Sequence, residues 1–180
     1  MRVLAFDLGT KTGWAYYDSD LVVDMNEANK VVTSGAYDIS SKRIENVGYK
    51  FIRFKRFVHD LIQAYLPQKI VFEEVRFHSM KATDAAHLYG ALQSILLMAC
   101  DGHYKPIPYE GIPPATAKKF ITGKGNADKN AVVNAIRSLG FKPKSHDESD
   151  AIAVLLTEIY KDNTPCIKPT QHKRSRKSNG

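Results

Sequence analysis

Five carboxylates stand where the neighbouring residues predict strand or helix termini. Asp7 ends the apolar run VLAF, Glu73 and Glu74 end the run IVF, and Asp147 and Asp150 lie three residues apart near the chain's end. Side chains at that last spacing share one face of a helix. If the first and fourth strands are neighbours and the final helix packs across them, acids from all three segments converge.

Converging carboxylates predict a metal site. Ionised carboxylates that are crowded together repel one another, and burying them without partners is costly. A hard divalent cation relieves the repulsion, and Mg²⁺ prefers carboxylate oxygen and water as ligands. Such a site suits phosphodiester hydrolysis with two ions about 3.5 to 4 Å apart. Gly9, just after Asp7, would let a phosphate-bearing substrate approach the backbone.

Each acid also has a simpler interpretation. Asp7 fits an Asx turn or a cap. Ser145 or Asp147 fits a helix N-cap, with Asp150 complementing the helix dipole. Glu73 and Glu74 point to opposite faces of a strand, so one of them is expected to be solvated or paired with a cation. Only the combined pattern favours a metal site.

Hydrophobic periodicity indicates a mixed α/β domain. The first three predicted strands form an antiparallel meander, and the first helix ends before Pro67. The helix at 82–100 is apolar nearly all round, so it needs cover on several sides, either within the core of a monomer or from the core together with another subunit. The expected elements are strands at 2–7, 12–17, 30–38, 69–75 and 104–111, and helices at 43–65, 82–100, 113–122, 127–140 and 145–160.

The length and net charge limit which classes of protein fit this sequence. The chain has 180 residues, which fits one domain; we expect that domain at 1–162 and a basic, disordered tail at 163–180. The net charge is +7, and the tail holds five of these charges and no acid, which favours an anionic partner such as nucleic acid. No secretory signal or membrane-spanning run is evident, so we expect a cytoplasmic protein. Cys100 and Cys166 lack the spacing of a zinc site.

Four stretches in order resemble the RuvC-like Holliday junction resolvases, especially the compact phage-type members, within the RNase H-like nuclease superfamily. They are AFDLGTKTGWAYY, VFEEV, GKGNADKNAVV and HDESDAIAV, and together they span about residues 3–156. The resemblance implies an RNase H-like mixed sheet flanked by helices, with strands 1–3 antiparallel and further strands parallel to strand 1. It also implies a homodimer, formed through the helix around 85–99, that nicks four-way DNA junctions.

Residue roles follow from the resemblance position by position. Asp7, Glu73, Asp147 and Asp150 match the family's four catalytic acids, which hold two Mg²⁺ ions, with Mn²⁺ as a substitute. Lys118 and Lys129 match two basic residues that act near the scissile phosphate, where a lysine can offset developing charge. Phe77 is the candidate for an aromatic wedge in the DNA. The residues expected to contact nucleic acid are Lys11, Arg76, Phe77, Lys81, Lys118, Lys124, Lys129, Lys173, Arg174, Arg176 and Lys177.

Three other functions fit parts of the sequence. DLGTKTG also resembles the phosphate turn of sugar kinases and actin-like ATPases, but 180 residues cannot supply the two lobes of those proteins. A YqgF-like nuclease acting on RNA, or a flap nuclease, would carry the same acids. A junction-binding protein without activity is disfavoured, because purely electrostatic DNA binding favours the loss of negative charge.

Overall fold

A five-stranded mixed sheet forms the centre of the protein in a computed structural model that describes residues 1–18, 24–40, 46–75 and 83–161. The strand order is β3-β2-β1-β4-β5. The strands are β1 (Arg2–Asp7), β2 (Lys11–Asp18), β3 (Thr33–Asp38), β4 (Lys69–Glu73) and β5 (Tyr109–Ile112).

Strand directions confirm the predicted mixed sheet. The first three strands pair antiparallel, and β1, β4 and β5 run parallel to one another. Parallel neighbours place their carboxyl ends at the same edge of a sheet. The last residues of β1 and β4 therefore lie at one edge.

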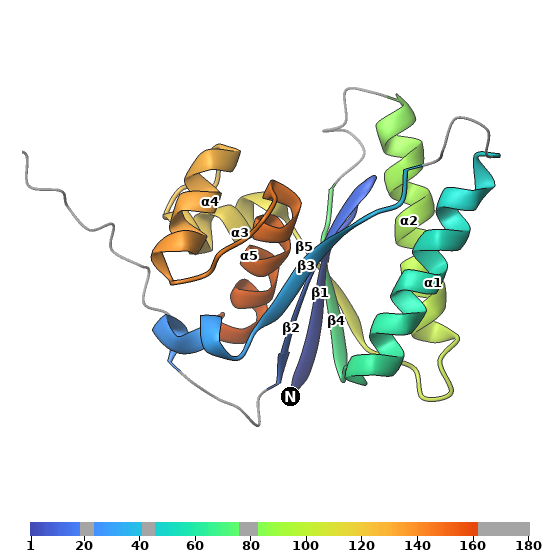
Figure 1. The fold of residues 1–180 in the computed structure, drawn as a ribbon, viewed down its shortest axis with the longest axis horizontal. Helices are drawn as coiled ribbons and strands as arrows, with labels where there is room; N and C mark the ends of the chain where they lie inside the picture. Colours follow the sequence, from blue (N-terminus) through green and yellow to red (C-terminus); the bar gives the residue numbers. More distant parts are fainter. Residues whose placement is uncertain (19–23, 41–45, 76–82, 162–180) are drawn as a thin grey trace, which may run out of the picture.

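Helices cover both faces of the sheet (Figure 1). One face carries α1 (Gly48–Tyr65) and α2 (Thr83–Asp101), and the other carries α3 (Pro114–Thr122), α4 (Lys129–Ser138) and α5 (His146–Tyr160). The helix α1 ends at Leu66, which adopts a left-handed conformation just before Pro67. None of the helices in the described ranges combines the length and apolarity needed to cross a bilayer.

The central strand β1 contributes to two cores because its residues are apolar on both sides. Val3 and Ala5 pack with α5, whereas Leu4 and Phe6 pack with α1 and α2. This alternation is the period of two that a strand imposes on its side chains. It places Asp7 on the same face as Val3 and Ala5, which is the face covered by α5.

Two strands begin several residues later than the sequence predicts. The third strand begins at Thr33 rather than residue 30, because a short 3-10 helix, η2 (Met25–Lys30), precedes it and the Val32 amide donates to the Ala28 carbonyl. The fifth begins at Tyr109 rather than residue 104, after Pro106 and Pro108, which have no amide proton for a ladder. The predicted tail at 163–180 and helix positions 43–45 lie outside the described residues.

A close contact joins β2 to the start of α5. A Cβ atom built on Gly13 would overlap the backbone carbonyl of Asp147, so only glycine permits this approach. Gly13 is also the residue that pairs with Asp7 in the β1–β2 ladder. The first turn of α5 therefore lies directly beside the end of β1.

Replacing Gly13 tests this contact. We expect Gly13→Ala to lower the free energy of unfolding by about 1 to 3 kcal/mol, because a methyl group there forces the helix away from the sheet. Gly48→Ala is the matched control, since a Cβ at Gly48 meets nothing within 4 Å, and its effect should stay within about 0.5 kcal/mol. Urea unfolding measures both variants. Equal midpoints for the two would contradict the contact.

Candidate active site

Asp7 and Glu73 lie side by side at one edge of the sheet. In the parallel β1–β4 ladder Phe6 is opposite Phe72, so the next residues on the two strands are neighbours. Val71, two residues before Glu73, packs in the α5 core, so strand alternation places Glu73 on the α5 face together with Asp7. Glu74 follows on the opposite face, and its side chain lies against Gly111 of β5.

The helix α5 brings the remaining two acids. Ser145 is its N-cap, with its hydroxyl accepting a hydrogen bond from the Glu148 amide at 3.1 Å. Asp147 is therefore not the cap, and it lies where the helix touches Gly13. Asp150, one turn further along, shares its helix face. The turn after Asp7 is closed by Thr12, whose Oγ1 donates to the Gly9 carbonyl at 2.8 Å.

The four carboxylates form one electrostatic group. Burial raises the pKa of Asp7 well above its usual value of 3.8, and the charges of Glu73, Asp150 and Asp147 raise it further. Burial and then the charge of Asp150 raise the pKa of Glu73 from 4.5 to about 7. Burial raises the pKa of Asp150 as well. The structure thus brings the four predicted acids together.

Two lysines oppose this negative charge. Lys118 on α3 and Lys129 at the start of α4 both lower the pKa values of Glu73 and Asp150, against the effect of burial. Lys129 acts on Asp7 in the same direction. Both lysines, which were predicted to act near the scissile phosphate, thus lie within electrostatic reach of the acids, and each comes from a different helix.

Other residues expected to bind nucleic acid are only partly described. Lys11 begins β2 and Lys124 follows α3, and both are exposed. The structure does not place either of them in the acidic group. The remaining candidates lie outside the described residues: Arg76, Phe77, Lys81, Lys173, Arg174, Arg176 and Lys177.

The donor set fits a divalent cation. In the described part of the chain, no group of three or more His, Cys, Asp or Glu side chains converges closely enough to hold a metal ion as the side chains stand. The four acids nevertheless supply the hard oxygen donors that Mg²⁺ and Mn²⁺ take. The raised pKa values of Asp7, Glu73 and Asp150 reflect first their burial and then the repulsion from neighbouring carboxylates, which a bound cation would relieve.

Two residues that bond the acid-bearing segments were not predicted from the sequence. The Glu148 side chain is 5% exposed and accepts hydrogen bonds from Ser34 on β3 and from the Lys144 amide. Its only sequence signal is the capping-box spacing Ser-x-x-Glu that begins at Ser145. The Tyr89 hydroxyl on α2 donates to the Glu73 carbonyl and accepts from the Val75 amide. No local sequence pattern predicts these two hydrogen bonds.

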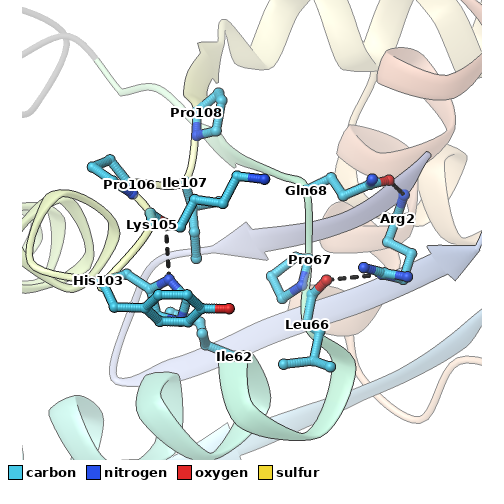
Figure 2. A pocket seen from close by; sticks show the side chains of 11 residues that line it. Arg2, Ile62, Leu66, Pro67, Gln68, His103, Lys105, Pro106, Ile107 and Pro108 are labelled. Carbon is cyan, nitrogen blue, oxygen red and sulfur yellow. Dashed lines mark hydrogen bonds between the residues drawn. The ribbon is translucent and has the colours of Figure 1, made fainter.

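A separate cavity lies near the starts of β1 and β4, at the opposite end of these strands from Asp7 and Glu73. It has a volume of about 400 Å³ and is lined by the starts of β1 and β4 and by the segment after α2, including Arg2, Gln68 and Lys105. In Figure 2 the Arg2 side chain bonds the Leu66 carbonyl. Because Arg2 begins the strand that Asp7 ends, this cavity is distinct from the acidic group.

Comparisons with known proteins agree with this geometry. A family model described as "Crossover junction endodeoxyribonuclease RuvC" matches residues 7–158. A relative of that name from Prochlorococcus marinus is 26% identical over 164 residues, covering 89% of this chain and 99% of its own length. Another, from Dictyoglomus turgidum, is 28% identical over 166 residues, covering 89% of this chain and 98% of its own length.

Solved structures share the fold. A structure of RuvC from T. thermophilus in complex with a Holliday junction substrate has a TM-score of 0.74 at 22% identity, covering 90% of this chain and 94% of that one. The yeast mitochondrial Holliday junction resolvase Ydc2 has a TM-score of 0.57 at 12% identity, covering 84% of this chain and 75% of that one. With a family match that runs from Asp7 to residue 158, the chain belongs to the RuvC family of crossover junction endodeoxyribonucleases.

Proposed function

We propose that this protein is a metal-dependent endodeoxyribonuclease that resolves four-way DNA junctions, with Asp7, Glu73, Asp147 and Asp150 as its catalytic acids. The observation that carries the proposal is the electrostatic contact of Asp7 with the other three carboxylates, whose charges raise its pKa on top of burial. Membership of the RuvC family supports the choice of DNA as substrate.

Metal binding accounts for the four acids. We assign them two Mg²⁺ ions, with Mn²⁺ as a substitute; when bound, the ions lower the pKa of an attacking water and stabilise the leaving oxygen. The acids would hold that centre from the ends of β1 and β4 and from α5, whose backbones are fixed by the strand ladder and by the Gly13 contact, and their side chains would draw together around the ions. Lys118 and Lys129 lie beside them, where an ammonium group can bind the non-bridging oxygens of the scissile phosphate.

Junction cutting also calls for a second active site. A four-way junction has two equivalent strands to nick, and a two-fold symmetric dimer presents two equivalent sites. We assign the dimer contact to α2, which carries half-buried Leu88, Ile95 and Leu97 and the 72% exposed Met98. The basic tail at 163–180 would add sequence-independent affinity for phosphates.

Replacing Asp7 tests the catalytic assignment. With Mg²⁺ or Mn²⁺, the wild type should make symmetric nicks in a synthetic four-way junction, and Asp7→Asn should cut on the order of 1,000-fold more slowly. Junction binding should persist, because the change removes negative charge near DNA. Asp60→Asn, on the exposed surface of α1, is the control. Flap, duplex and RNA–DNA substrates run alongside; preferential cutting of RNA or flaps would overturn the junction assignment.

A pair of adjacent lysines tests the role of Lys118. Lys118→Met should lower kcat by about 100-fold, because the positive charge beside Glu73 and Asp150 is lost. Lys119 is the next residue of the same helix and is exposed, so Lys119→Met provides a control of equal helix propensity and charge change. Similar kcat values for the two variants would exclude Lys118 from the site.

The raised pKa values predict how stability depends on pH without metal. The folded protein keeps a proton on Glu73 up to about pH 7, whereas the unfolded chain loses it near 4.5. The folded state therefore binds more protons between these values, and stability in EDTA should fall as the pH rises through this window, by about 3 kcal/mol. Glu73→Gln should reduce the dependence by the share of Glu73 and leave that of Asp7 and Asp150, whereas Glu27→Gln, on the exposed η2, should leave the dependence unchanged.

Urea unfolding from pH 4.5 to 8 measures this slope. Adding Mg²⁺ at pH 8 should raise the stability of the wild type more than that of Glu73→Gln, because only the wild type has the full donor set. A wild-type stability that rises through this window, or a Mg²⁺ effect equal in both proteins, contradicts the coupled acidic site.

A further inference from the structure

Glu148 lies in sequence between two of the proposed catalytic acids, yet its side chain is directed elsewhere. The residue is 5% exposed. One oxygen accepts from Ser34 Oγ on β3 at 2.8 Å, and the other accepts from the Lys144 amide at 2.7 Å. Both oxygens are thus engaged away from the acidic group. A buried carboxylate is tolerated only with such partners.

These two bonds fix the first turn of α5. The bond to Ser34 joins α5 to β3, the outermost strand of the sheet. The bond to the Lys144 amide joins α5 to the segment that immediately precedes it. On the adjoining strand, Gly13 meets the backbone of Asp147. Contacts on two strands define both the rotation of the helix about its axis and its height above the sheet.

From this arrangement we propose that Glu148 is a positioning residue: it sets the rotation of α5 so that Asp147 and Asp150 face Asp7 and Glu73. This inference rests on the proposed function, since it assigns a role to a residue that supports the same site. Asp147 and Asp150 are on the same helix as Glu148, so a small rotation there displaces both acids together. A displacement of 1 Å can lower a rate by about 100-fold.

The proposal makes length and hydrogen bonding the essential properties of Glu148, rather than its charge. Glutamine has the same length; its amide oxygen can accept from the Lys144 N–H, and its amide nitrogen can donate to Ser34 Oγ. Aspartate keeps the charge but is one methylene shorter, so it cannot reach both partners. The two substitutions therefore separate positioning from electrostatics.

The experiment compares Glu148→Gln, Glu148→Asp and Ser34→Ala in the full chain with Mg²⁺ and a four-way junction. We expect Glu148→Gln to keep kcat within about threefold of wild type, and Glu148→Asp to lose about 10- to 100-fold in kcat or in Mg²⁺ affinity. Ser34→Ala should lower kcat less, because it removes only one of the two hydrogen bonds that Glu148 accepts. Glu27→Asp, on the exposed η2, is the control.

Urea unfolding establishes that each variant is folded at the assay temperature, and kcat is expressed per folded molecule. A Glu148→Gln variant as inactive as Asp7→Asn overturns the proposal, because charge at the metal site would then be the essential property. Wild-type kcat and Mg²⁺ affinity in folded Glu148→Asp overturn it as well, because Glu148 would then stabilise the fold only. A wild type that cuts no nucleic acid instead overturns the proposed function.

Discussion

Repulsion among carboxylates from both ends of the chain is what this fold has to accommodate. The charges of Glu73, Asp150 and Asp147 raise the pKa of Asp7 beyond the effect of burial, and the charge of Asp150 does the same to Glu73. Such a group opposes folding unless its energy is offset elsewhere, and the two buried cores on either side of the sheet provide that offset. Natural proteins tolerate such local instability mainly at functional sites, so the cluster of four carboxylates indicates a functional site.

The sheet topology is what brings acids from both ends of the chain together. Parallel pairing of β1 with β4 sets two strand ends side by side, and the glycine at position 13 lets α5 approach them without a side chain between. Two of the three acid-bearing segments are also held to another element by side-chain hydrogen bonds: Glu148 on α5 bonds Ser34 on β3, and Tyr89 on α2 bonds the backbone on both sides of Glu74. A site built from ordinary strands and one helix thus gains rigidity from a few long-range hydrogen bonds.

Much of this arrangement could be predicted from sequence because the acids interrupt apolar patterns. Asp7 and Glu73 end strands that are otherwise buried, and the spacing of Asp147 and Asp150 fits a helix face. Glu148 could not be assigned a partner in this way, because Ser34 lies 114 residues earlier in the chain. The predicted start of β3 was wrong for a local reason. Val31 and Val32 have high strand propensity, but they complete the turn after a 3-10 helix.

Anomalous diffraction from crystals soaked in Mn²⁺ would show whether these four acids share bound metal. We expect two anomalous peaks at the ends of β1 and β4, with oxygen ligands from Asp7, Glu73 and the first turns of α5. Peaks confined to other acidic residues, with these four carboxylates free of metal at saturating Mn²⁺, would contradict this expectation.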